Sequence, residues 1–432
     1  MYRLKPQKAV FTALLLGCLA TGGQAAEPLN EKNEALALPA SSPELIDFVR
    51  NVVPSNPRVR AARSALNASG AFHLAASQPL YNPRFSFESQ HSHEDRHYLG
   101  LRQRIDLVDK RSARTSVASA DRLAVHAEYI FTRRAVTADL LSGLAGYQTG
   151  VEREALATKR VRLMRDFATL TKKRFEAGDM ARVEFNLAIL VFADARMQQA
   201  TVRTTLIDAR QQVTNLIPPN ITTPWPTLEA GLPALPAQDD LEALLTALPE
   251  VQAAQRRIDS AKAAITLRQR QRVLDPTVGV TRGEEAGEGL WGVNLTLPLP
   301  LRNPFRYEVT AAYRQYQQAQ QTVNDILRRA RARLVNAFER YRIAHNAWQD
   351  WQRIGPSSAQ QQADHLRRLW QAGELNATEF LVQTSRTIDS QDSALQLRQA
   401  LWLAWFEWLV ASGKVDEWLN VGSYTKTYGT PD

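Results

Sequence analysis

Two stretches of this sequence, RFEAGD at residues 174–179 and LWQAGE at residues 369–374, occupy the same place in two halves of the chain. Each is followed at the same distance by an acidic and an aromatic residue, Glu184-Phe185 and Glu379-Phe380. An earlier pair of segments, NPRF at 82–85 and DPTV at 275–278, repeats at nearly the same spacing. A long internal repeat indicates that each half is one structural unit. The two halves of the chain are therefore predicted to contain the same secondary-structure elements in the same order.

Very long helices are predicted immediately before the two stretches. The chain has no proline from Arg111 to Ala177, and only Pro356 interrupts the segment from Arg306 to Ala372. Apolar residues recur at heptad-like spacing in the first segment, at Val136, Leu140, Leu144, Tyr147 and Val151. A helix of this length extends about 100 Å, at about 1.5 Å per residue. Such helices form coiled-coil pairs rather than a compact core.

Short strands are predicted in each half, upstream of the long helix. Residues about 83–105 and about 276–299 alternate apolar and polar side chains, as in FSF at 85–87 and VGV at 278–280. Polar connectors join the strands of each pair, which indicates two hairpins. Four strands are too few to close a sheet within one chain.

The start of the chain is predicted to be an export signal. Residues 1–25 combine a basic start, an apolar run and small residues at the cut, so cleavage after Ala25 is one interpretation. The other is a lipoprotein signal, in which Cys18 of the segment LLGC becomes the lipidated first residue. Both interpretations place the mature chain outside the cytoplasm.

The mature chain is predicted to contain two repeats, a linker and a tail. Proline is concentrated in the linker, which indicates irregular structure there. The predicted segments are the first repeat at 26–217 with its helical hairpin at about 109–217, the linker at 218–248, the second repeat at 249–413 with its hairpin at about 304–413, and the tail at 414–432.

Composition excludes several classes of protein. A single cysteine excludes a disulfide scaffold and a cysteine-rich zinc site. The 22% of charged residues and the mean hydropathy of -0.33 argue against a bundle of membrane-spanning helices. The net charge is +9, but the arginines are spread along both long helices, so no nucleic-acid partner is predicted. No phosphate loop, nucleophile elbow or zinc-protease motif is present, which predicts neither an enzyme nor a cofactor.

These features together resemble the TolC-like outer-membrane efflux proteins. The resemblance implies a mainly α fold with a small β part, in which three copies share one twelve-stranded transmembrane β-barrel and a helical tunnel in the periplasm. It implies a homotrimer in outer-membrane lipid that serves as the channel of a tripartite pump. The implied partners are a periplasmic adaptor, or membrane fusion protein, and an inner-membrane transporter of the RND type.

The resemblance also assigns roles to the two repeated stretches, which match the tips where the family's long helices reverse. The residues implied to contact the adaptor are Phe175, Gly178, Asp179, Trp370, Gly373 and Glu374. Glu184 and Glu379 are implied to lie at the pore entrance, where rings of carboxylates favour cations. The alternative is that both glutamates are ordinary solvated helix residues.

Two further segments, DKRSAR at 109–114 and LPLPLRN at 297–303, resemble the cobalt-zinc-cadmium branch of the family. Val108-Asp109 stands where that branch usually has a Gly-Gly pair. The resemblance implies export of heavy-metal cations. The alternatives are export of drugs or organic solvents by the same fold, a general diffusion porin, and a periplasmic coiled-coil structural protein.

Conspicuous side chains elsewhere have two interpretations each. His91, His93 and His97 are ligand types for divalent metals, although a loop tip of this kind is more simply hydrophilic. Tryptophans near the last helix's end are predicted to form a buried stripe, at Trp402, Trp405 and Trp408. Aromatic residues nearer the strands are predicted to mark the membrane interface, at Tyr81, Tyr98 and Trp291.

Overall fold

A computed structural model describes residues 41–91, 96–228, 241–285, 287–299 and 301–420. All of these belong to one compact unit. The predicted signal peptide with Cys18 lies outside the described residues, as do His93, part of the predicted linker and the end of the tail. Within the described ranges, no helix is long and apolar enough to cross a membrane.

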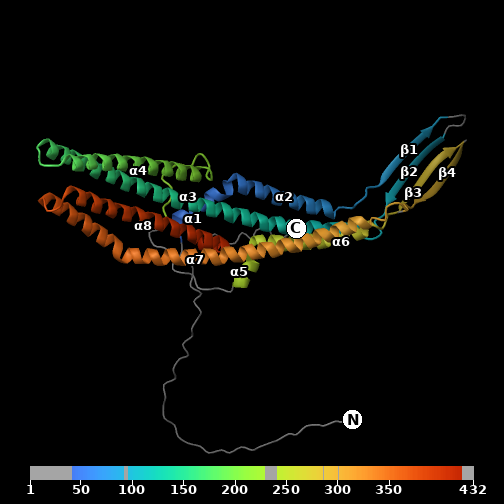
Figure 1. Cartoon of the computed structure of the whole chain (residues 1–432). Helices are drawn as coiled ribbons and strands as arrows, with labels where there is room; N and C mark the ends of the chain where they lie inside the picture. The colour runs from blue at the N-terminus through green and yellow to red at the C-terminus, as the bar shows by residue number, and fades with distance from the viewer. Residues whose placement is uncertain (1–40, 92–95, 229–240, 286, 300, 421–432) are drawn as a thin grey trace, which may run out of the picture. The chain divides into compact units, whose positions relative to one another are not determined.

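Four long helices form two antiparallel pairs (Figure 1). In the first half, α3 (Lys110–Glu176) packs against α4 (Arg182–Thr214), and in the second half α7 (Arg306–Ala372) packs against α8 (Ala377–Ser412). Both α3 and α7 have 67 residues, and Pro356 lies inside α7 without ending it. The predicted fold class, mainly helical with a small sheet, is confirmed.

Shorter helices pack against the long helices in the half of the molecule nearest to the sheet. The helix α2 (Pro57–Ser77) packs on α3, whereas α6 (Pro249–Gln271) packs on both α3 and α7. Both begin with proline at the first helical position, where the missing backbone N–H costs no hydrogen bond. The remaining short helices are α1 (Pro43–Val52), the 3-10 turn Val53–Ser55, α5 (Leu241–Ala247) and α9 (Val415–Trp418).

The four strands form one antiparallel sheet in the order β1-β2-β3-β4 (Figure 1). The strands are β1 (Arg84–Gln90), β2 (Arg96–Arg104), β3 (Thr277–Glu285) and β4 (Glu288–Thr296). The central β2–β3 pair joins the two halves of the chain, with Leu101 opposite Val280. β1 and β4 are therefore edge strands.

One face of the sheet is apolar and exposed. Phe85 lies opposite Leu101, and Val280 lies opposite Val293, so most of the apolar side chains of the four strands share this face. Trp291 is 81% exposed on this face, and its place at a membrane interface stays a prediction. The opposite face carries mainly polar, charged and glycine residues, with Leu290 among them.

The largest core lies where α8 packs between the halves. Trp402, Trp405 and Trp408 are all buried there, which confirms the predicted stripe. Trp405 packs against Tyr341 of α7, with ring centroids 5.1 Å apart. A smaller core lies near the helix tips. The two cores leave the sheet without a hydrophobic core of its own among the described residues.

Candidate functional site: the helix tips and the joint between sheet and helices

The two helix tips have the same backbone structure. Gly178 (φ +83°) and Gly373 (φ +76°) adopt the left-handed conformation after the last residues of α3 and α7. The amide of Asp179 donates to the carbonyl of Arg174, and the amide of Glu374 donates to that of Leu369. This six-residue closure satisfies the last carbonyls of a helix and favours glycine at the left-handed position. The repeated Ala-Gly-acid motif thus ends both long helices in the same way.

Aromatic side chains fix the tips from inside. Trp370 is only 7% exposed and packs with Phe167 of α3 and Phe380 of α8, at ring-centroid distances of 5.1 Å each. It therefore joins the two helical pairs instead of lying on the tip surface. Phe175 is half-buried and stacks on Phe185 at 5.2 Å. The exposed members of the predicted contact set are Gly178, Asp179, Gly373 and Glu374.

The two predicted entrance glutamates occupy equivalent places in the first turns of their helices. Glu184 of α4 is half-buried, and Glu379 of α8 is exposed. The amide of Glu379 donates to the side chain of Asn376, and its carboxylate accepts a hydrogen bond from Gln383. Carboxylates in a first helical turn are also stabilised by the helix dipole. Their part in a ring remains a prediction, because a ring requires further copies of the chain.

The histidines are at the far end of the sheet from the helices. His91 follows β1, and Nδ1 of His97 lies 3.0 Å from Oγ of Ser89 on the neighbouring strand. His93, the third candidate ligand, lies outside the described residues. In the described part of the chain, no group of three His, Cys, Asp or Glu side chains is placed to bind a metal ion.

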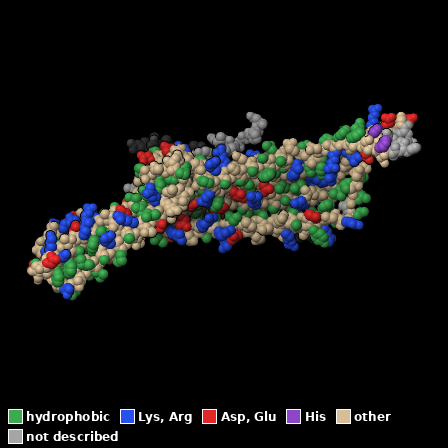
Figure 2. Space-filling view, turned by 90° about the horizontal axis from the view of Figure 1, so that it is seen from above, with side chains coloured by type: hydrophobic (Ala, Val, Ile, Leu, Met, Phe, Trp, Pro, Cys, Tyr) green, Lys and Arg blue, Asp and Glu red, His purple; other side chains and the backbone are tan. Residues whose placement is uncertain are grey.

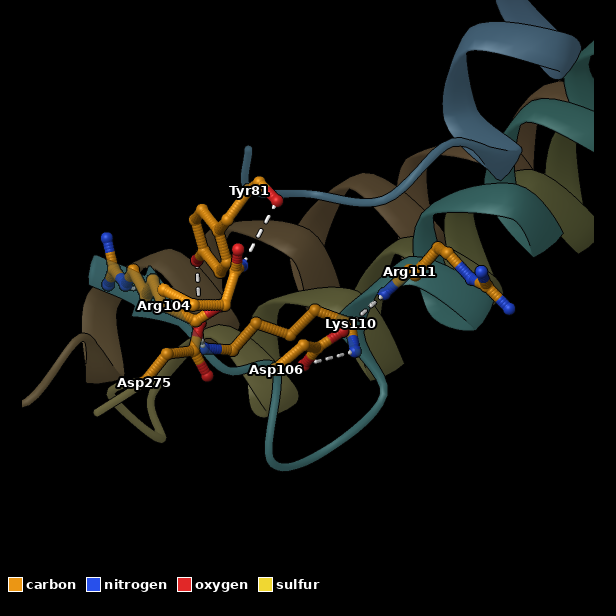
Figure 3. Close-up of polar contacts among 7 residues, drawn as sticks. Tyr81, Arg104, Asp106, Lys110, Arg111 and Asp275 are labelled. Carbon is orange, nitrogen blue, oxygen red and sulfur yellow. Dashed lines mark hydrogen bonds and ion pairs between the residues drawn. The ribbon is translucent and has the colours of Figure 1, made fainter. Parts of the chain in front are cut away.

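A buried ion pair, not predicted from the sequence, lies at the joint between the sheet and the helices (Figure 3). The ammonium of Lys110 lies 2.7 Å from Oδ2 of Asp275, and the two side chains are 5% and 0% exposed. The hydroxyl of Tyr81 donates to the same oxygen at 2.6 Å. Lys110 begins α3 and Asp275 precedes β3, so the pair ties the two halves together.

Tyr81 is held inside this cluster. Burial, together with the hydrogen bond to Asp275 and the charge of Asp275, raises the pKa of Tyr81 to about 12. Its ring lies under the guanidinium of Arg104, 4.6 Å from the ring centroid. The residue was predicted to mark the membrane interface, but its hydroxyl is engaged by a buried carboxylate. Sequence reasoning missed this role because the partner is far along the chain.

The start of α3 depends on a second carboxylate of the joint. Asp106 accepts hydrogen bonds from the backbone amides of Lys110 and Arg111, at 2.9 and 3.0 Å. Burial alone would raise the pKa of Asp106, but these hydrogen bonds and the charge of Lys110 outweigh it and hold the pKa below its usual value. Asp106 therefore stabilises the first turn of α3 beside Asp109, the N-cap residue, whose carboxylate accepts a hydrogen bond from the amide of Ser112.

Further ion pairs join α3 of the first half to α8 of the second. Arg153 binds Asp392 through two nitrogens, at 2.6 and 2.9 Å, and Arg160 binds Asp389 at 2.6 Å. Arg398 of α8 also binds Glu152 of α3. Bidentate hydrogen bonds between arginine and a carboxylate fix the relative orientation of the two side chains and also stabilise their contact. These pairs therefore set how the two helical pairs lie against each other.

Acid is expected to weaken the contact between α3 and α8. Burial alone would raise the pKa of Asp392, but the hydrogen bond and charge of Arg153 outweigh it, so the pKa lies below its ordinary value. The unfolded carboxyl binds its proton near pH 3.9, roughly, and the folded one only at lower pH, so the stabilisation is lost as pH falls below about 4. Unfolding by urea between pH 3 and 6 should show less acid destabilisation in Asp392→Asn. Asp350→Asn, at an exposed pair, serves as the control; equal acid sensitivity of both variants and the natural protein would contradict this assignment.

Charge on the helical part is scattered. Figure 2 shows Lys and Arg side chains distributed over the helices and interspersed with acidic ones. Many of these arginines pair with acids one turn away, as Arg353 does with Asp350. Nucleic-acid binding requires a concentrated basic patch. The distribution does not favour a nucleic-acid partner.

The chain thus has two long helical hairpins whose tips reverse at glycines and a small sheet at the other end (Figure 1). Residues 50–217 match the family model described as outer membrane efflux protein. The chain is 28% identical over 221 residues to the cobalt-zinc-cadmium resistance protein CzcC of Cupriavidus metallidurans. That match covers 50% of this chain and 53% of the relative, so the chain matches about half the length of this curated relative.

Solved structures share the fold at low sequence identity. The outer membrane channel CmeC of Campylobacter jejuni has a TM-score of 0.74 with 12% identity, over 86% of each chain. CusC, described in connection with transmembrane channel formation, has a TM-score of 0.70 with 15% identity, over 85% of this chain and 92% of that one. The predicted resemblance to outer-membrane efflux proteins is confirmed by the match of residues 50–217 to that family's model and by the shared fold. The matched family is one of outer-membrane channels and not of enzymes.

Proposed function

We propose that three copies of this chain form the outer-membrane channel of a tripartite efflux pump that exports heavy-metal cations. The observation that carries the proposal is that each chain has an incomplete sheet on a long helical scaffold. The sheet has two edge strands, β1 and β4, and an apolar face left in solvent. Unpaired strand edges are not tolerated in lipid, so further strands have to complete the sheet.

Copies of the same chain are the simplest source of those strands. The side chains on the apolar face are largely exposed, including Phe85 at 71%, Val293 at 66% and Leu295 at 62%. A surface of this kind suits lipid. The helices also leave apolar side chains uncovered, such as Leu190 and Met197 on α4 and Ile343 on α7. These helices would pack against those of neighbouring copies in a trimer.

The tips are proposed to contact a periplasmic adaptor. Their exposed residues, Gly178, Asp179, Gly373 and Glu374, lie at the reversals of both helical pairs, farthest from the sheet (Figure 1). An inner-membrane transporter would supply energy and load the cargo. Trp370 would act indirectly, by holding the tip backbone in place.

The choice of metal cations as cargo rests on two supports. One is the similarity to a protein named for cobalt, zinc and cadmium resistance. The other is the equivalent position of Glu184 and Glu379 near the tips, since a threefold assembly would carry six such carboxylates at its entrance. Rings of carboxylates concentrate cations.

Deletion of the gene tests the proposal. We expect a deletion strain to lose resistance to zinc, cobalt or cadmium in graded growth assays and to regain it when the gene is restored. A loss confined to antibiotics or organic solvents would replace the cargo and keep the channel. Normal growth on every compound, with the protein in the soluble fraction, would contradict the channel itself.

A further inference from the structure

Two arginines lie directly opposite each other on the polar face of the sheet. Arg84 at the start of β1 pairs in register with Arg102 of β2, and both side chains are exposed. Arg104, two positions farther along β2, is on the same face. Its guanidinium is occupied by the ring of Tyr81 and lies 4.0 Å from buried Asp275. Among the described residues, no acidic side chain forms an ion pair with Arg84 or Arg102.

The surroundings of this pair are neutral hydrogen-bonding groups. The same face carries, in the half of the sheet next to the helices, Ser86, Thr277, Gly279, Thr281, Asn294 and Thr296. A Cβ atom at Gly279 would lie 2.8 Å from Cγ of Arg102, so glycine leaves room for the arginine stem to cross β3. Asn294 approaches Gly279 from the other side.

The carboxylates of this end of the sheet either lie several residues away from the arginine pair or are bound by other groups. Glu88 lies on the same face of β1 but four residues farther from the helices, opposite Tyr98. Asp275 is bound by Lys110 and Tyr81, and Asp106 binds the first turn of α3. Like charges directly opposite on neighbouring strands destabilise a sheet. The arrangement therefore needs a negative group that the described part of the chain does not supply.

We propose that Arg84 and Arg102 form a binding site for a dissolved oxyanion such as phosphate or sulfate. The planar fork of an arginine matches two oxygens of such an ion, and two arginines together offer up to four N–H donors. The hydroxyl and amide groups nearby supply further donors. Because the site is on the face opposite the apolar one, its ligand comes from water and not from lipid.

Binding of an oxyanion at this site does not depend on the proposed function, whereas its effect on the channel rests on the proposed trimer. Binding of an oxyanion concerns the single chain. In the proposed trimer, six arginines would line the sheet's water-filled side, at the end remote from the carboxylates of the tips. The two ends of the tunnel would then carry opposite charge, and anions would be concentrated where cargo leaves.

A stability assay tests the site itself. The purified protein is heated with and without inorganic phosphate, with chloride at equal ionic strength as the reference. We expect phosphate to raise the unfolding midpoint by about 2 °C or more in the natural protein and not in Arg84→Gln/Arg102→Gln. The matched control is Arg60→Gln/Arg63→Gln, which removes the same charge from two exposed residues of α2. Equal shifts in all three proteins would overturn the site, and a shift caused by phosphatidylglycerol but not by phosphate would assign it to lipid.

A conductance assay tests its effect in the assembled channel. Reversal potentials in a potassium chloride gradient are measured in planar bilayers. We expect Arg84→Gln/Arg102→Gln to shift the permeability ratio toward potassium by about twofold or more, and the α2 control to leave it unchanged. Channels with identical selectivity in all three proteins would overturn this inference and leave the proposed function intact. Failure of the natural protein to form channels would instead count against the proposed function.

Discussion

Replacement of Asp275 with alanine is expected to lower the free energy of unfolding by about 3–5 kcal/mol, because it leaves the charge of Lys110 buried without a partner. Both side chains are almost inaccessible, at 0% and 5%, and the hydroxyl of Tyr81 loses its acceptor as well. Thermal or urea unfolding of the purified protein measures the change. Strand pairing at the joint should loosen first, because Asp275 directly precedes Pro276, whose carbonyl accepts the amide of Ile105.

Two further variants separate charge from packing. Lys110→Met/Asp275→Leu replaces the ion pair with apolar groups and should recover a large part of the lost stability, since paired removal leaves no buried charge. Asp350→Ala removes a carboxylate from an exposed pair and should change stability by about 0.5 kcal/mol or less. If Asp275→Ala behaved like Asp350→Ala, the joint would not be held by this ion pair.

Replacement of Gly373 with valine is expected to reduce export to nearly the level of a deletion strain while the protein still assembles. The backbone of Gly373 has φ +76°, and a branched side chain there costs about 1–2 kcal/mol or more. No neighbour within 4 Å would meet the new Cβ, so the effect comes from the backbone of the tip and not from crowding. Growth on metal and the oligomeric state of the extracted protein measure the two parts of the expectation.

The controls for this prediction use the same residue type. Gly373→Asn should keep most of the export, because asparagine tolerates the left-handed conformation. Gly70→Ala, inside α2 with nothing within 4 Å, should have no effect on export. Full resistance in Gly373→Val would show that the tip conformation is unimportant for function.

Local patterns predict most of the fold of this chain. The long helices follow from the absence of proline and the heptad spacing, and the strands follow from alternation, because both signals arise from neighbouring residues. The repeated glycines identify the tips, since a left-handed backbone demands a particular residue type. Pro356 illustrates the opposite case: a proline usually ends or kinks a helix, but Pro356 lies inside α7 without ending it.

Contacts between the halves were not predictable in the same way. Lys110 and Asp275 are in different repeats, and each belongs to a motif that was interpreted for another purpose. Lys110 belongs to the branch-like segment DKRSAR, and Asp275 belongs to the repeated segment DPTV. The motif implies an adaptor contact for Trp370 because its position in the motif is visible from sequence, whereas its burial depends on Phe167 and Phe380 from other helices. Pairings of this kind require the three-dimensional arrangement.

The matched lengths of α3 and α7 set the reach of the molecule. Because both helices start at the joint and both have 67 residues, their two reversals fall at a common level. Removal of one heptad from both helices, with seven residues from each returning helix, would draw that level back by about 10 Å. Removal of a heptad from only one of the two helical hairpins would place the two tips at different levels. Both tips therefore stay at one level only if any change in the length of α3 is matched by an equal change in α7.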